Sequence, residues 1–146
     1  APTGPAHGAG MPDVAVPCFT GGRQVRLDRA YGRPTIVNLW ASWCQPCRRE
    51  LPEIARYAKT HPDVLVLTVD TGDRRSAGES FARAAGVRLP TLFDEDRRVL
   101  GGVGRSALPA TVLVDADGTV AYTYNSTALT ARTLDSLVHR HLPGAR

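Results

Sequence analysis

The sequence predicts an α/β domain with a mixed central β-sheet flanked by helices. Short apolar segments of strand length alternate along the chain with longer segments whose apolar residues recur at helical spacing, a pattern typical of layered α/β domains. Near the end of the chain, two strand-like segments flank Asp115-Ala-Asp-Gly118, which is a hairpin turn signal. We therefore expect part of the sheet to be antiparallel.

Size and composition agree with a single globular domain. The chain has 146 residues, of which 42% are hydrophobic and 22% are charged, within the ordinary globular range. No stretch approaches the roughly 18 consecutive apolar residues of a membrane-spanning helix. The net charge of +4 comes almost wholly from arginines that are scattered singly or in pairs, so we expect a solvated surface and no nucleic-acid partner.

In the first half of the chain we expect a β-hairpin, two buried strands and one helix. The hairpin comprises residues 14–19 and 24–27 around Gly21-Gly22, the buried strands are 35–40 and 64–69, and the helix is 44–59.

Residues 1–12 form a separate segment rich in Gly, Pro and Ala, without hydrophobic periodicity. This composition indicates a flexible lead-in or tether before a domain of residues 13–146. Such a tether often follows a cleaved signal or a membrane anchor, and it is equally common at a cloning boundary, so the sequence leaves its origin open.

The second half is expected to continue the alternation. Ser76-Ala-Gly-Glu79 has the pattern of a capping box and predicts the start of a helix that ends at Gly86. The remaining expected elements are a strand at 91–93, one or two helical turns within 97–103, strands at 111–114 and 119–124, and a helix from about 130 to 141.

Three cysteines are present, and two of them form the motif Cys44-Gln-Pro-Cys47. An odd number excludes a complete framework of structural disulfides, and a single C-x-x-C supplies only two of the four ligands that structural zinc needs. The third, Cys18, is expected to be a small apolar residue of the hairpin, with a third redox or linkage thiol as the alternative.

The position of this motif between a buried strand and a helix indicates redox chemistry. Cys44 falls at or just before the helix N-terminus, where the helix dipole and free N–H groups stabilise a thiolate. We therefore expect Cys44 to be the nucleophile and Cys47, one turn further in, to resolve the mixed disulfide. Arg48 can add positive charge to the same turn, and Trp43 is expected to cover one side of the sulfur. The alternatives are an inert structural disulfide and a pair of thiols that stays reduced in the core.

Residues 37–52, Val-Asn-Leu-Trp-Ala-Ser-Trp-Cys-Gln-Pro-Cys-Arg-Arg-Glu-Leu-Pro, resemble the active-site segment of the TlpA/ResA-like branch of the thioredoxin superfamily. The resemblance extends from about residue 11 to residue 142 and includes Leu108-Pro-Ala-Thr-Val-Leu-Val-Asp-Ala-Asp-Gly118. It implies a thioredoxin fold with an N-terminal β-hairpin extension. Such proteins are usually exported and often membrane-tethered, and they commonly reduce disulfides outside the cytoplasm, including those of apocytochrome c.

The resemblance also implies a substrate-binding surface. Pro109 matches the cis-proline that faces the C-x-x-C motif and helps to bind an extended substrate by backbone pairing. Leu108 and Trp43 are expected to bind substrate beside it. Pro90 is the alternative cis-proline, but it lacks the following hairpin.

A further implication of the resemblance concerns proton transfer. Glu50 matches an acidic residue near the active cysteines, and an exposed glutamate on the helix surface is the alternative. Thioredoxin itself has a buried aspartate where this chain has Asn38, whose neutral amide cannot act as a base. Proton transfer is therefore expected to fall to Glu50 or to water.

We therefore expect an extracytoplasmic thiol-disulfide oxidoreductase, acting as a reductase, with the Cys44–Cys47 pair as its redox group and no metal or other cofactor. The expected partners are protein disulfides or thiols and a membrane electron donor such as a thiol-reducing transporter, and the chain is expected to be a monomer. The alternatives are an oxidase that inserts disulfides and a copper-binding chaperone. A chaperone is disfavoured because no histidine falls in a segment expected beside Cys44.

Overall fold

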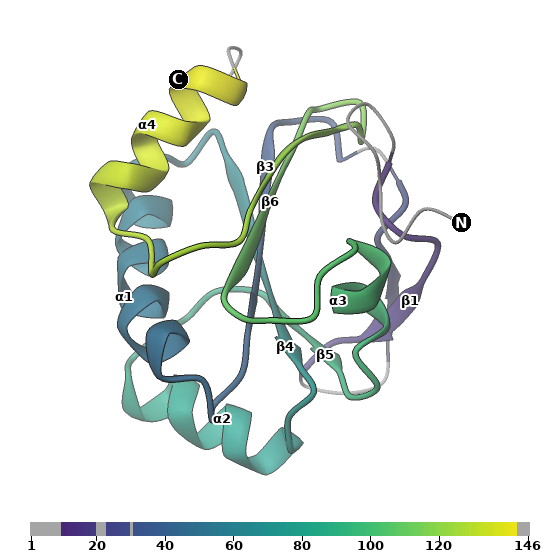
Figure 1. Cartoon of the computed structure of the whole chain (residues 1–146), viewed down its shortest axis with the longest axis vertical. Helices are drawn as coiled ribbons and strands as arrows, with labels where there is room; N and C mark the ends of the chain where they lie inside the picture. The colour runs from purple at the N-terminus through teal and green to yellow at the C-terminus, as the bar shows by residue number, and fades with distance from the viewer. Residues whose placement is uncertain (1–9, 20–22, 30, 143–146) are drawn as a thin grey trace.

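The computed structural model describes residues 10–19, 23–29 and 31–142. At its centre lies a five-stranded sheet with the strand order β5-β4-β3-β6-β7 (Figure 1). Strands β3 (Thr35–Trp40), β4 (Leu65–Thr71) and β5 (Thr91–Asp94) are parallel, whereas β6 (Ala110–Val114) runs antiparallel to both β3 and β7 (Val120–Tyr124). The mixed sheet of the expected thioredoxin fold is therefore confirmed.

Helices cover both faces of this sheet (Figure 1). On one face, α1 (Gln45–Thr60) and α4 (Ala131–His141) enclose an apolar core with side chains of β3 and β6. On the opposite face lies the shorter α3 (Arg98–Gly102), together with the N-terminal hairpin. Helix α2 (Arg75–Ala84) lies at the end of the sheet where α1 begins. Helices α1, α3 and α4 bury apolar side chains, and α2 packs its partly buried Phe81 and Ala82 against the core; these contacts stabilise the layers because apolar surface leaves water.

The predicted N-terminal hairpin is confirmed. Strand β1 (Ala15–Pro17) pairs antiparallel with β2 (Gln24–Arg26), and residues 20–22 of the predicted turn lie outside the described residues. Just after β1, Cys18 forms an isolated antiparallel bridge with Leu92 of β5. The hairpin is thereby attached to the β5 edge of the central sheet.

The end of the predicted lead-in contacts the domain. Gly10 forms a β-bridge with Thr119, and Met11 is buried in the core on the hairpin side. Pro12 packs against Gly102 of α3. Residues 10–12 are thus part of the packed structure, while residues 1–9 lie outside the described residues and their role as a tether stays a prediction.

Helix α2 begins differently from the prediction. Its N-cap residue is Arg74, whose side chain makes no capping hydrogen bond, so Ser76 lies inside the helix and the predicted capping box is wrong. The Asp73 carboxylate accepts the backbone N–H of Arg74 at 2.8 Å. An acid immediately before the helix therefore interacts with its N-terminus in place of the serine.

Three connections meet at the end of the sheet where the site lies. Strand β3 runs into α1 there, and β4 runs into α2 at the same end because β3 and β4 are parallel. Strand β6 is antiparallel to β3, so its first residue, Ala110, pairs with Leu39 near the end of β3. The residues before β6, including Pro109, are thereby brought beside the start of α1.

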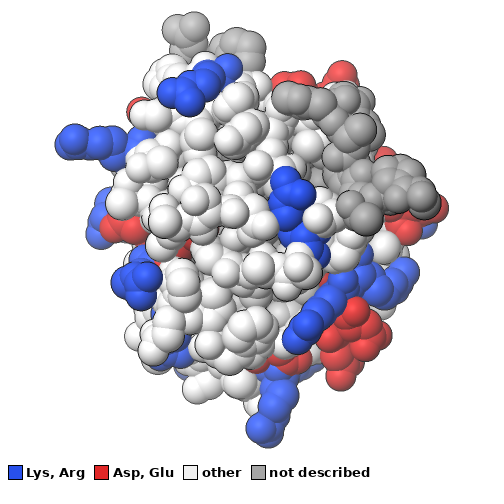
Figure 2. Space-filling model, viewed as in Figure 1, with Lys and Arg blue, Asp and Glu red and all other residues white. Residues whose placement is uncertain are grey.

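The charged side chains do not gather into one stripe. On the face shown in Figure 2, most lysine and arginine side chains are dispersed around the rim with acidic side chains among them, and basic atoms also lie nearer the middle of the face. That face therefore offers no continuous basic track of the kind that binds a nucleic-acid backbone. Separately, none of the helices in the described ranges combines the length and apolar character needed to cross a bilayer.

Candidate active site

The two cysteines of the motif form a disulfide at the N-terminus of α1. Cys44 is the N-cap residue and Cys47 lies in the first turn, with 5.2 Å between their Cα atoms. The Cys47 backbone N–H donates to the Cys44 Sγ atom at 3.2 Å, an interaction that also favours a thiolate once the disulfide is reduced. Pro46 fits this first turn because its missing N–H would have no partner inside the helix.

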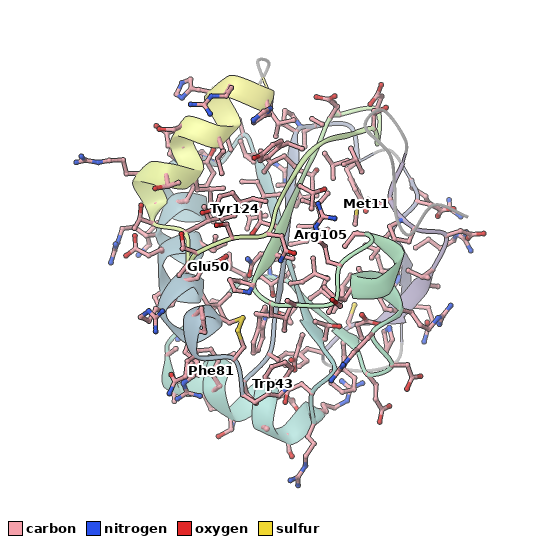
Figure 3. All side chains as sticks on the ribbon, in the orientation of Figure 1. Met11, Trp43, Glu50, Phe81, Arg105 and Tyr124 are labelled. Carbon is pink, nitrogen blue, oxygen red and sulfur yellow. A yellow bond between two sulfur atoms is a disulfide. The ribbon has the colours of Figure 1, made fainter. Side chains whose placement is uncertain are left out.

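Both sulfur-bearing residues lie in apolar surroundings. Cys44 is 4% exposed and Cys47 is 1% exposed, so Cys47 is the less accessible of the two, as a resolving thiol requires. The buried cluster around them includes Trp40, Ala41 and Leu51, and Phe19, Phe81 and Leu108 pack against it. In Figure 3 the yellow disulfide lies between the labelled Glu50 and Phe81.

Trp43 lies differently from the prediction. Its side chain is 57% exposed, and its indole Nε1 donates to the Gly72 carbonyl at 2.9 Å, in the connection between β4 and α2. The apolar cover expected from Trp43 comes from Phe81 and Leu108, which belong to other parts of the chain. Trp43 instead presents an exposed aromatic surface next to Cys44.

The loop that leads to Cys44 is held by Asp73. Its carboxylate accepts the Ser42 backbone N–H at 2.8 Å and the Ser42 hydroxyl at 2.9 Å. The Ser42 carbonyl accepts a hydrogen bond from Arg48 at 3.0 Å, and the same guanidinium lies over the Phe81 ring, 4.6 Å from its centroid. Neither partner of Arg48, a loop carbonyl or an aromatic ring, is an acid. The positive charge of Arg48 is therefore not neutralised by these contacts, and it lies near the N-terminus of α1.

The loop before β6 carries the expected cis-proline. The Leu108–Pro109 peptide bond is cis, and the bond before Pro90 is not. Pro109 is buried, whereas Leu108 is half-buried and packs against the cysteine cluster. The structure therefore brings Leu108 to the disulfide, while the substrate-binding role of these residues stays a prediction.

Glu50 lies one helical turn beyond Cys47 and is buried, with 1% of its surface exposed. Its Oε1 atom accepts a hydrogen bond from the Asn38 amide at 2.8 Å and one from the Thr111 hydroxyl at 3.4 Å. Its Oε2 atom has no hydrogen-bond partner among the described residues. The alternative of an exposed surface glutamate is therefore wrong.

Burial changes the acidity of Glu50. Desolvation raises the pKa of its carboxyl to about 7, although the nearby Leu129 backbone amide and the hydrogen bonds from Asn38 and Thr111 act in the opposite direction. A group with a pKa near the working pH can both accept and release a proton. Asn38, predicted to be unable to take a proton itself, donates a hydrogen bond that holds Glu50 in place.

A second buried acid, Asp70, lies on β4 beside Trp40 of β3, and the sequence reasoning missed it. The side chain is fully buried, and neither carboxyl oxygen has a hydrogen-bond partner among the described residues. It packs so closely on Gly78 of α2 that a Cβ atom there would overlap the carboxyl group. The available signal was an acid within a strand whose neighbours are apolar or threonine.

The two neighbouring acids Asp70 and Asp73 differ in charge. Burial, followed by repulsion from Asp73, raises the pKa of Asp70 to about 9, so this carboxyl is neutral at pH 7. Burial alone would raise the pKa of Asp73. The pKa is lowered overall, because the neutral Asp70 lies nearby and because Ser42 and the Arg74 backbone donate hydrogen bonds to the Asp73 carboxylate. Asp73 is therefore the anion that holds the loop before Cys44.

The Asp70→Asn variant is expected to have a flatter dependence of stability on pH. The unfolded carboxyl ionises near 3.8 and the folded one near 9, so the folded state loses stability as the pH rises between these values. Because each pH unit corresponds to about 1.4 kcal/mol, the parental protein should lose on the order of 4 kcal/mol more unfolding free energy than the variant between pH 5 and pH 8. Urea unfolding at both pH values measures this difference.

The matched control for this measurement is Asp63→Asn, which removes an exposed carboxylate. It should keep the parental slope of unfolding free energy against pH. An Asp70→Asn variant with that same slope would show that Asp70 is ionised in the folded protein.

Cys18 is the free cysteine, half-buried and packed against the core on the hairpin side. This environment agrees with the prediction of a small apolar residue. Within the described ranges, no group of three or more His, Cys, Asp or Glu side chains is placed to hold a metal ion.

Comparison with known proteins supports the redox interpretation of this geometry. The AhpC/TSA family matches residues 7–123. The thiol-disulfide oxidoreductase ResA of Bacillus subtilis is 30% identical over 125 residues, covering 84% of this chain and 67% of the relative. The protein of the same name from Geobacillus thermodenitrificans is 32% identical over 120 residues, covering 81% of this chain and 68% of the relative.

Solved structures show the same fold. A secreted disulfide oxidoreductase of Mycobacterium tuberculosis, homologous to E. coli DsbE, superposes with a TM-score of 0.78 at 23% identity, covering 88% of this chain and 96% of that one. A secreted thiol-disulfide isomerase from Corynebacterium glutamicum has a TM-score of 0.75 at 24% identity, covering 91% of this chain and 83% of that one. The disulfide lies at a helix N-terminus with a cis-proline loop beside it, and the family match covers most of the chain. This protein therefore belongs to the AhpC/TSA family of the thioredoxin superfamily and is a ResA-like thiol-disulfide oxidoreductase.

Proposed function

We propose that this protein is an extracytoplasmic disulfide reductase that passes electrons from a membrane thiol donor to the disulfides of exported proteins. The secreted proteins of similar structure support the location, and the resemblance to the TlpA/ResA-like branch supports apocytochrome c as one substrate. The same resemblance supports attachment to a membrane, and the composition of the predicted lead-in, residues 1–12, is that of a tether. We further propose that the chain acts as a monomer.

The observation that carries the direction is the carboxyl group buried beside the cysteines. Glu50 is a potential anion one turn from Cys47, and its pKa is raised to about 7. A neighbouring carboxylate disfavours a thiolate, so it destabilises the reduced pair relative to the disulfide. A dithiol that is less stable in its reduced form has a more negative reduction potential and gives up electrons more readily. This arrangement favours a reductase over an oxidase.

The proposed reaction begins with the Cys44 thiolate. It attacks one sulfur of a substrate disulfide, which forms a mixed disulfide and releases the first substrate thiolate. Glu50 accepts the proton of Cys47, whose thiolate then attacks the Cys44 sulfur. The Cys44–Cys47 disulfide forms, the second substrate thiolate leaves, and two electrons have passed to the substrate. A dithiol donor at the membrane restores the reduced pair by the reverse exchange.

The substrate chain is proposed to lie across the surface that surrounds Cys44. Leu108 and Pro109 would pair with its backbone, and the exposed indole of Trp43 would contact its side chains. No cofactor other than the Cys44–Cys47 pair takes part in this reaction.

The reduction potential of the Cys44–Cys47 pair tests the direction. Equilibration in dithiothreitol buffers of known ratio, followed by alkylation and mass spectrometry, should give a potential near roughly −270 mV, as for reductases of this superfamily. A potential near roughly −120 mV would mark an oxidase and would overturn the proposal. Titration of the reduced protein with Cu(I) separates both from a copper chaperone, which would bind the metal tightly.

A further inference from the structure

The loop before β6 has few internal attachments. Among the described residues, the segment 106–109 takes part in two hydrogen bonds, and both come from the side-chain amide of Asn125. The amide Nδ2 donates to the Ala107 carbonyl at 3.1 Å and to the Pro109 carbonyl at 2.7 Å. One side chain therefore holds the carbonyls on either side of Leu108.

Asn125 is well placed for this contact by the topology of the sheet. It directly follows Tyr124, which is labelled in Figure 3 and which ends β7. Tyr124 pairs with Thr111 in the antiparallel β6–β7 ladder, so the residue that follows β7 lies beside the residues that precede β6. The two positions are far apart in sequence and are joined through the ladder.

Asn125 binds the carbonyls of Ala107 and Pro109 but not the backbone groups of Leu108, which lies between them. The Leu108 N–H and C=O groups have no hydrogen-bond partner among the described residues. Its side chain packs against the cysteine cluster. An unpaired donor and acceptor next to the disulfide are the groups that an added extended peptide would need for backbone pairing.

We propose that Asn125 is a positioning residue that fixes the 106–109 loop so that the Leu108 backbone can pair with the substrate chain. This inference rests on the proposed function, in which Leu108 and Pro109 form the substrate surface. Asn125 acts on substrate binding through the loop and does not touch the reacting sulfur atoms. It should therefore influence reactions with peptides and leave the chemistry of the cysteine pair unchanged.

The variants Asn125→Asp and Asn125→Ala test this role. The aspartate has nearly the same shape but presents only acceptors to the two carbonyls, and the alanine removes the contact. We expect the KM for insulin disulfides, with dithiothreitol as the electron donor, to rise roughly threefold to tenfold in both variants at nearly unchanged kcat, the loss expected from ordinary hydrogen bonds. The rate of the reduced protein with 5,5′-dithiobis(2-nitrobenzoate), which has no peptide backbone, and the reduction potential should stay parental.

The control Ser126→Ala alters the exposed neighbour of Asn125 and should keep the parental KM. Parental KM values in both Asn125 variants would overturn the inference, as would a shift in reduction potential that accompanies the KM change. The variant Pro109→Ala separates the two proposals. If it raises the KM and the Asn125 variants do not, the positioning role alone fails. If it also leaves the KM parental, the substrate surface itself is wrong and the inference fails with it.

Discussion

The Cys44→Ser variant is expected to lose thiol-disulfide exchange completely, whereas Cys47→Ser should keep a reactive thiol and accumulate mixed disulfides. Cys44 is the N-cap of α1, where the helix N-terminus and the Cys47 N–H stabilise its thiolate. Cys47 lies deeper, with 1% of its surface exposed. Removal of the resolving thiol therefore leaves the first step intact and blocks the second.

Mass spectrometry of both variants after exposure to oxidised glutathione measures this difference. Cys47→Ser should carry one glutathione on Cys44, and Cys44→Ser should remain almost unmodified at Cys47. Cys18→Ala in each background removes the remaining thiol, so that adducts report on the active pair alone. Adducts that form on Cys47 in preference to Cys44 would reverse the assignment of the two roles.

The Glu50→Gln variant should fold and form the Cys44–Cys47 disulfide, with resolution of the mixed disulfide slowed roughly tenfold to a hundredfold, at the low end for one acid–base group. The amide keeps the shape of the side chain but cannot take the Cys47 proton. Because the pKa of Glu50 is about 7, the parental rate should rise with pH through this value as the carboxylate forms. The variant should lack that inflection.

Stopped-flow measurement of resolution between pH 5 and pH 9 gives both rate and inflection. Glu95→Gln, which changes an exposed glutamate after β5, is the matched control and should follow the parental curve. A Glu50→Gln variant that reacts at the parental rate across this range would show that the proton goes directly to water.

Periodicity was sufficient to predict the central elements of the fold. Strand 35–40 agrees with β3 at both ends, because all six of its residues are buried and four of them, Ile36, Val37, Leu39 and Trp40, are apolar residues that are visible in sequence. Strand β4 continues two residues past its predicted end at Val69, through Asp70 and Thr71. These polar residues resemble the start of a loop, and only tertiary packing keeps them in the buried sheet.

The cysteine pair and Glu50 could be predicted because their signals are local. They lie within one short segment, in which helical spacing determines which side chains share a face. Asp70 and Asn125 could not be found in this way, because their roles depend on contacts between different elements of the fold, which helical or strand spacing does not relate. Gly78 approaches Asp70 across a helix–sheet contact, and Asn125 reaches Pro109 through the β6–β7 ladder. Single-sequence periodicity carries no information about such contacts.

The close approach of Gly78 to Asp70 couples the effects of substitutions at two positions that are eight residues apart in sequence. Any side chain at position 78 would occupy the space of the buried carboxyl group, so substitution there requires the Asp70 carboxyl to move or position 70 to become smaller. Asp70→Ala should create that space, and Gly78→Ala should then be far less destabilising than in the parental background. The effects of substitutions at the two positions are therefore not additive, and the order in which they are made decides how far the intermediate is destabilised.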